Sequence, residues 1–139
     1  MAEVGGEGQE RICQARILLH GEAPLCATYL AAAGLGCLLH TGEPPELSAH
    51  DPRFEMRAAA PGDDADLVLD LGDGAALRAA AGPALWGAAH GARVLLDAVP
   101  VEGEEPAPAA RAVLETLAAC ESLRRLMGHA PNRYEFTVG

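Results

Sequence analysis

Short apolar runs alternate along this chain with longer stretches in which apolar residues recur at helical spacing, and glycines and prolines separate them. Short apolar runs bounded by turn residues indicate buried strands, whereas a 3.6-residue period indicates helices. The pattern predicts strands at 16–20, 38–40, 54–58, 66–71, 93–97 and 134–138, and helices at 7–14, 25–33, 75–90 and 109–127. Gly82-Pro83 falls near the middle of the 75–90 helix, which is therefore expected in two pieces.

This alternation predicts a single α/β domain with a Rossmann-like, doubly wound and mainly parallel sheet. The ligand crevice of such a sheet lies at the carboxyl ends of its strands. Here that edge would be built from residues 21–26, 41–46 and 72–75. In the last helix, an apolar stripe is expected to pack on the core; it consists of Val113, Leu117, Cys120, Leu123 and Met127.

Charge and composition narrow the range of partners. Twenty acidic residues against ten basic ones give a net charge of −10, the wrong sign for a phosphate backbone, so no nucleic-acid partner is expected. Every basic residue is Arg, and the chain has no Lys. Only 4% of the residues are aromatic, so each buried side chain contributes little area and a partner surface is expected to help.

The cysteines lie on apolar segments without the close spacing of a metal site. Cys13, Cys26, Cys37 and Cys120 form no CxxC or CxH pattern, so no zinc site is expected and buried, reduced thiols are the simpler interpretation. No apolar run approaches the roughly 18 residues of a membrane span, and no signal-peptide core follows a basic start. These features predict a cytoplasmic protein that does not bind membranes.

The segments 16–36 and 65–74 resemble those of a known family. Arg16 to Gly21 and Ala27 to Gly36 match the first strand and helix of the ThiF/MoeB/HesA superfamily, relatives of the ubiquitin-activating enzymes, and Ala65 to Gly74 is similar to its ADLVxDxTDN run. The resemblance implies a Rossmann-like fold. It also implies an enzyme that uses ATP and magnesium to adenylate the C-terminus of a ubiquitin-like sulfur-carrier protein or of a peptide. It also implies a magnesium-binding role for Asp73. The alternative role for Asp73 is the N-cap of the helix that follows.

The chain departs from the family pattern in its phosphate-binding loop. The GxGGLG run falls on residues 21–26, where only Gly21 remains a glycine. Pro24 removes an N–H donor, and Glu22 would repel a phosphate charge about 4 Å away by about 4 kcal/mol at an effective dielectric near 20. Both residues also suit a helix end that binds nothing. At the position of the family's ribose-binding acid stands Thr41, followed by Glu43, and residues 48–51 lack the Asn and Arg of the SNLxRQ run.

The candidate site is therefore small. Gly21, Thr41, Glu43 and Asp73 are the candidate cofactor-binding residues, and Asp73 is the candidate for magnesium and for catalysis. His20 and His40 end strands near the crevice, where each could contact a ligand or serve as a hydrogen-bonded strand-end histidine. The family's zinc-binding cysteines and its mobile segment with a catalytic cysteine would fall at 102–108, a linker without cysteine.

Three functional hypotheses follow. The first is a shortened, degenerate member of the superfamily, covering residues 1–139 with an N-terminal helix in 1–15, that binds no cofactor. Such a pseudoenzyme would act as a homodimer, or as a heterodimer with a full-length relative, and bind a ubiquitin-like or sulfur-carrier protein or a peptide. The second is a minimal ATP-dependent adenylyltransferase that uses Asp73 and Glu43 for the metal. The third is a binder of a small apolar ligand or of a different nucleotide.

Overall fold

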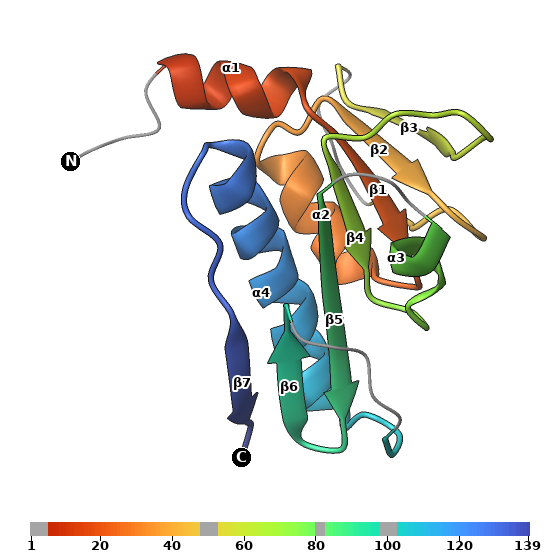
Figure 1. Ribbon diagram of the computed structural model, residues 1–139, viewed down its shortest axis with the longest axis vertical. Helices are drawn as coiled ribbons and strands as arrows, with labels where there is room; N and C mark the ends of the chain where they lie inside the picture. Colours follow the sequence, from red (N-terminus) through yellow and green to blue (C-terminus); the bar gives the residue numbers. More distant parts are fainter. Residues whose placement is uncertain (1–5, 48–52, 80–82, 98–102) are drawn as a thin grey trace.

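The protein folds around one seven-stranded sheet with strand order β3-β2-β1-β4-β5-β6-β7 (Figure 1). The computed structural model describes residues 6–47, 53–79, 83–97 and 103–139. The strands are β1 (Arg16–His20), β2 (Cys37–His40), β3 (Glu55–Ala58), β4 (Leu67–Asp70), β5 (Ala84–His90), β6 (Arg93–Leu96) and β7 (Tyr134–Thr137). The helices are α1 (Gly6–Gln14), α2 (Pro24–Ala32), α3 (Ala75–Ala79) and α4 (Pro108–Leu126).

The first five strands run parallel, and β5, β6 and β7 pair antiparallel. The chain winds from β1 outward to β2 and β3, then returns to place β4 on the other side of β1. The winding direction thus reverses between β1 and β4, which is where a sheet of this type opens a crevice. The predicted doubly wound, mainly parallel sheet is confirmed.

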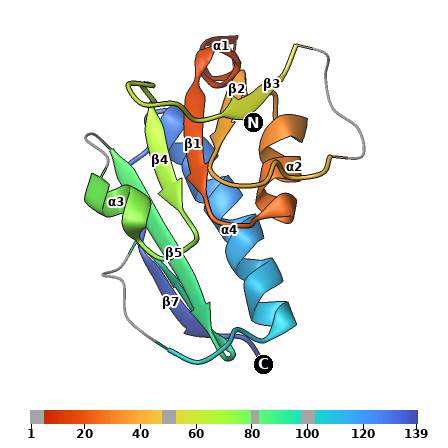
Figure 2. The same ribbon diagram turned by 90° about the vertical axis from the view of Figure 1, so that its right-hand side faces the viewer.

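Helices α2 and α4 cover one face of this sheet, and α3 lies on the other (Figure 2). The core forms between α2, α4 and the alternate strand residues that point toward them, including Ile17, Leu19, Leu69, Leu85 and Val94. On the α3 side a smaller cluster joins Trp86, Ala88 and Leu95. None of the helices in the described ranges combines the length and apolarity needed to cross a bilayer.

The predicted helix at 75–90 is wrong in its second half. Helix α3 ends at Ala79, and residues 84–90 form β5, which pairs with β4 through Val68 and Ala84. An alanine-rich segment has high helix propensity, but burial between two strands overrides it. The segment needs small residues because a side chain at Gly87 would begin 2.9 Å from Leu114, Leu71 and Leu96.

The apolar stripe predicted for the last helix packs against the core at Val113, Leu117, Leu123 and Met127, but these residues do not form the centre of the contact. The buried residues of α4 are mostly small, namely Ala110, Leu114, Ala118, Ala119 and Ser122, together with Glu115 and Glu121. The stripe residues Val113, Leu117, Leu123 and Met127 are half-buried, and Cys120 is exposed. Alanines let α4 approach the sheet closely, so the helix turns its smallest residues inward. Cys13 is exposed too, whereas Cys26 and Cys37 are buried as expected.

Glu121 fastens the last strand to α4. Its carboxylate is fully buried and accepts hydrogen bonds from Arg124 at 2.7 Å, from Arg125 at 2.8 Å and from the backbone N–H of Asn132 at 2.9 Å. The segment that leads into β7 is therefore anchored by a charge in the core. Burial raises the pKa of Glu121, but the Asn132 N–H and the two guanidinium groups outweigh burial and hold that pKa below its ordinary value.

Replacing Glu121 should destabilise the protein strongly. We expect Glu121→Ala to lower the free energy of unfolding by about 3 kcal/mol, because it removes several charge-assisted hydrogen bonds and leaves a cavity where the buried carboxylate lay. The depressed pKa means that the wild type keeps this stabilisation above the ordinary glutamate pKa and loses it as the pH falls through the folded-state value. Denaturant titrations at neutral and acidic pH would measure both effects. Glu105→Ala, at an exposed position, is the control, and an equal loss in both variants would contradict the prediction.

Candidate functional site

The predicted loops after β1, β2 and β4 meet at the carboxyl edge of the sheet. A hollow of about 310 Å³ lies between the first two loops and is lined by Gly21, Glu22, Pro24, Glu43, Glu46 and neighbouring residues. A shallower hollow of about 520 Å³ adds Thr41 to Gly21 and Glu43. The four candidate cofactor-binding residues therefore lie at one edge, with Asp73 joined to the others through His20.

Gly21 has a structural reason to be glycine. Its φ is +106°, and a side chain there would begin 2.8 Å from the backbone nitrogen of Gly72. The loop after β1 and the loop after β4 thus touch backbone to backbone at this point. The one glycine left from the family's phosphate loop is needed for this contact even when nothing is bound.

An internal carboxylate occupies the N-terminus of α2. The N-cap residue Ala23 offers no side-chain hydrogen bond, and Pro24 has no N–H. The next two N–H groups, of Leu25 and Cys26, donate to Oε1 of Glu115 at 2.9 and 3.3 Å. In nucleotide-binding proteins of this architecture, such N–H groups at the first helix bind phosphate. Here α4 supplies the anion that they bind.

Arg111 holds Glu115 in place and joins the site loops. Its Nε lies 3.6 Å from Glu115 Oε2, while its other nitrogens donate to the carbonyl oxygens of Leu71 at 3.1 Å and Glu22 at 2.5 Å. Burial, followed by the nearby charge of Glu115, raises the pKa of the Cys26 thiol far above its ordinary value. That thiol therefore stays protonated and does not act as a nucleophile.

The roles of Arg111 and Glu115 on α4 were not predicted from the sequence. Glu115 lies 90 positions after the N–H group of Leu25 that it binds. The only signal in the sequence is a carboxylate inside an otherwise apolar part of the helix pattern, where a charge needs a partner.

Asp70 organises the loop after β4. It is fully buried; one oxygen accepts the N–H groups of Gly72 and Gly74, and the other those of Ala76 and Leu77. The Asp70 carboxylate thus accepts the hydrogen bonds of N–H groups in this turn and at the start of α3, where strand or helix carbonyl groups would otherwise be needed. Sequence reasoning did not single out Asp70, although an acid at the end of a buried strand was a visible signal.

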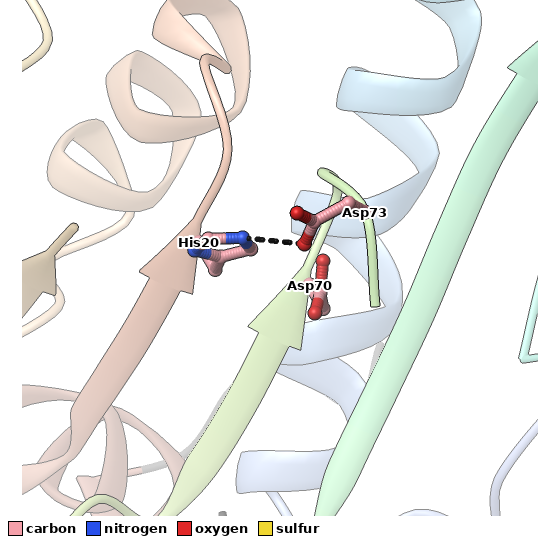
Figure 3. A group of neighbouring side chains, drawn as sticks. All are labelled: His20, Asp70 and Asp73. Atoms are coloured by element: carbon pink, nitrogen blue, oxygen red, sulfur yellow. Dashed lines mark hydrogen bonds and ion pairs between the residues drawn. The ribbon is translucent and has the colours of Figure 1, made fainter. Parts of the chain in front are cut away.

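His20 lies between a hydroxyl and a carboxylate. Its Nδ1 is 2.7 Å from Thr41 Oγ1. Its Nε2 is 3.0 Å from Asp73 Oδ1, and Figure 3 shows this second contact. The same Asp73 oxygen accepts the N–H of Ala75 at 2.9 Å, consistent with the N-cap role. The Ala75 N–H first, and His20 second, lower the pKa of Asp73, which therefore stays ionised near neutral pH. The other strand-end histidine, His40, is nearly buried and bonds the Gly42 carbonyl through Nδ1 at 3.2 Å.

One group of side chains has the spacing of a cation site. His20, Asp70 and Asp73 each offer one atom within 4.8 Å of the others. As a set they do not suit magnesium, which prefers oxygen ligands, because one donor is a nitrogen and Asp70 is saturated by N–H groups. Magnesium at Asp73 alone stays a prediction. Residues 48–51, at the position of the SNLxRQ run, lie outside the described residues.

The backbone contact at Gly21 can be tested against a second glycine. Gly21→Ala should lower the free energy of unfolding by about 3 kcal/mol, because it adds a clash to a strained φ. Gly42→Ala is the matched control: φ is +77° but no atom lies within 4 Å of the added carbon, so the loss should be about 1 kcal/mol. Equal losses by thermal or urea unfolding would refute the close approach.

Comparison with known proteins supports the fold. No protein-family model matches the sequence, and no curated protein matches it either. Among solved structures, E. coli MccB with succinimide aligns with a TM-score of 0.69 at 10% sequence identity, over 95% of this chain and 63% of that chain. MccB with ATP also gives 0.69 at 10% identity, over 96% of this chain and 66% of that one.

A second protein, PaaA, aligns with a TM-score of 0.67 at 14% identity, over 95% of this chain and 63% of that chain. MccB is described as a microcin C7 biosynthetic enzyme and has been solved in complex with N-formylated MccA. The present chain thus spans 63% of the length of the MccB chain with succinimide and of the PaaA chain. At this identity the likeness shows the fold alone: over nearly all of its length the chain has the Rossmann-like fold of MccB and PaaA, the type of fold that the resemblance of its motifs predicted.

Proposed function

We propose that this chain does not adenylate, and that it acts as a dimeric binding partner in a ubiquitin-like, sulfur-carrier or peptide-modification pathway. The observation that carries the proposal is the carboxylate of Glu115 on the N–H groups of Leu25 and Cys26. Those groups are the ones that a nucleotide phosphate would need.

Displacing that carboxylate would be costly. Glu115 is nearly buried and is held by Arg111, so a phosphate arriving at α2 would meet a fixed negative charge. At about 4 Å and an effective dielectric near 20, the repulsion amounts to about 4 kcal/mol. A penalty of that size weakens binding roughly a thousandfold.

The rest of the crevice adds to the repulsion. Glu22, Glu43 and Glu46 line the hollow beside α2, and the lining residues include no basic side chain except the nearly buried His40. The guanidinium of Arg111 already serves two carbonyl oxygens and a carboxylate. An anionic ligand such as a nucleotide triphosphate therefore lacks compensating charge in this hollow.

Helices α2 and α4 offer a surface that suits a binding role. No Asp, Glu or Arg occurs between Glu22 and Glu43, and α2 exposes Tyr29, whose exposed fraction is 47%. On α4, Glu115 and Glu121 point inward while Cys120 is exposed. We define the uncharged helix face by Tyr29 on α2 and Cys120 on α4. Two chains of charge −10 approach each other most easily through such a face.

The solved MccB complexes guide the choice of partner. MccB has been captured with MccA, so a short peptide or the C-terminal tail of a small carrier protein is the natural class of partner for a chain with the same fold. Adenylation remains the alternative function. It is favoured by the ionised Asp73 at the end of β4, by Glu43 nearby, and by the solved complex of MccB with ATP.

Nucleotide binding provides the first test. We expect ATP with magnesium to leave the melting temperature of the wild type unchanged, because a ligand raises it only by binding the folded state. An appreciable rise would refute the proposal and favour adenylation. A pyrophosphate-exchange assay with carrier peptides, compared with Asp73→Ala, would then measure the activity.

A variant pair tests the role of Glu115 directly. Glu115→Ala vacates the N–H groups of Leu25 and Cys26, so inorganic pyrophosphate should raise the melting temperature of this variant above its own value without ligand. Glu22→Ala also removes one negative charge, from the loop that precedes α2, but it leaves Glu115 in place, so pyrophosphate should not raise its melting temperature. If the two variants respond alike, the carboxylate is not what excludes the anion.

A measurement of association through the uncharged helix face is the third test. We expect sedimentation velocity to show a dimer in the wild type and a monomer in Tyr29→Arg, which places a charge on that face. Phe136→Arg is the control, since Phe136 is 39% exposed on the edge strand β7. A wild type that is monomeric and binds no ubiquitin-like carrier or peptide in calorimetry would contradict the binding role.

A further inference from the structure

We propose that Thr41, His20 and Asp73 form a hydroxyl–imidazole–carboxylate relay in which Thr41 is an acyl-accepting nucleophile, giving this chain hydrolytic activity toward uncharged short-chain esters or thioesters. The inference goes beyond the binding role above. It requires neither ATP nor a metal, and it concerns groups that the binding role does not use.

The hydrogen bonds fix the direction of the relay. An ionised carboxylate only accepts, so Asp73 Oδ1 takes the proton on Nε2 of His20 across 3.0 Å. Nδ1 is then the unprotonated nitrogen, and the Thr41 hydroxyl donates to it across 2.7 Å. A nucleophile bonded to a base, with the base oriented by a third group, is the arrangement that activates hydroxyls in acyl transfer.

The three groups come from three different parallel strands or the loops that follow them. His20 ends β1, Thr41 follows β2, and Asp73 lies in the loop after β4. The backbone of the loop that carries Asp73 is held by the four N–H groups that donate to the buried Asp70. The Asp73 side chain is 72% exposed and is oriented by the Ala75 N–H and by His20.

Thr41 is accessible from two sides. It lines the hollow of about 520 Å³ with His20 and Gly42, and it also lines a second hollow of about 600 Å³ on the α3 side of the sheet. No atom lies within 4 Å of the position where a side chain at Gly42 would begin. A carbonyl group can therefore approach the hydroxyl without displacing protein atoms at Gly42.

The second hollow indicates the class of substrate. Leu18 and Val68 form part of its lining with Ala75 and Ala76, which suits a short apolar acyl chain. Asp64 also lines this hollow, and Glu22 and Glu43 line the other hollow that Thr41 borders. These carboxylates repel anions, so the substrate should carry no negative charge. A hollow of about 600 Å³ is open enough for a short chain.

The chemistry balances with water as the only co-reactant. Thr41 Oγ1 attacks the carbonyl carbon while its proton passes to Nδ1 of His20, and Asp73 stabilises the resulting imidazolium. The bond to the leaving alcohol or thiol then breaks, and that group takes the proton from His20. Water next attacks the acyl-Thr41 ester, giving one proton to His20, which returns it to Oγ1 as the acid leaves. The net reaction is ester plus water to acid plus alcohol.

Covalent labelling of the wild type is the decisive test. A fluorophosphonate probe should form an adduct on Thr41, located by tandem mass spectrometry of the intact folded protein. p-Nitrophenyl butyrate should be hydrolysed, and Thr41→Val, His20→Gln and Asp73→Asn should each lower kcat/KM at least tenfold. No adduct on Thr41 in the folded wild type would overturn the proposal, whatever the variants do.

Matched controls separate the relay from background reactivity. Thr28→Val removes a hydroxyl that bonds the Pro24 carbonyl on α2, and His129→Gln removes an exposed histidine outside the site. Both should keep wild-type hydrolysis and labelling. Equal loss in the controls, or unchanged hydrolysis in Thr41→Val, would refute the relay. Neither result bears on ATP binding or dimerisation, so the proposed function stands or falls separately.

Discussion

The bond between the Glu115 carboxylate and the first N–H groups of α2 constrains the whole carboxyl edge of the sheet. A helix start without a side-chain cap leaves donors that must find an acceptor. In this chain α4 supplies the acceptor, and Arg111 couples it to the loops after β1 and β4. Hydrogen bonds and ion pairing within the protein therefore connect α4 to the loops that form the crevice.

The same principle recurs at other acids. Asp70 satisfies the loop after β4, and Glu121 joins α4 to the approach to β7. Each of these carboxylates is buried, and each accepts several hydrogen bonds from groups that would otherwise bond to backbone carbonyls or water. A chain with few aromatic residues gains little from each buried side chain, so these carboxylates compensate by fixing the loops between elements. The acidic composition is thus partly structural.

Sequence reasoning predicted the fold because the relevant signals are local. The strands at Arg16–His20 and Leu67–Asp70 are short apolar runs. Prolines at its start and a glycine after its end indicate the bounds of α4. Strand β5 was missed because alanine favours helix, and only its burial between β4 and β6 makes it a strand. The stripe on α4 packs against the core as predicted except at Cys120, but the alanines at the centre of that contact were not singled out, because small residues give a weak apolar signal. Prediction also brought Gly21, Thr41, Glu43 and Asp73 to one edge. It could not find Glu115 or the bond from His20 to Thr41, because such long-range partners have no local signature.

The distance along the chain between α2 and its capping acid has a consequence for how the molecule is made. Residues 25 and 115 are separated by 90 positions, so the amino end of α2 stays incomplete until residue 115 has left the ribosome. Closing so long a loop is entropically slow, and high contact order retards folding. A nascent chain that stops before α4 would leave α2 uncapped and would expose the part of the sheet that α4 covers to chaperones and proteases. Assembly of this protein is therefore expected to wait for its last helix.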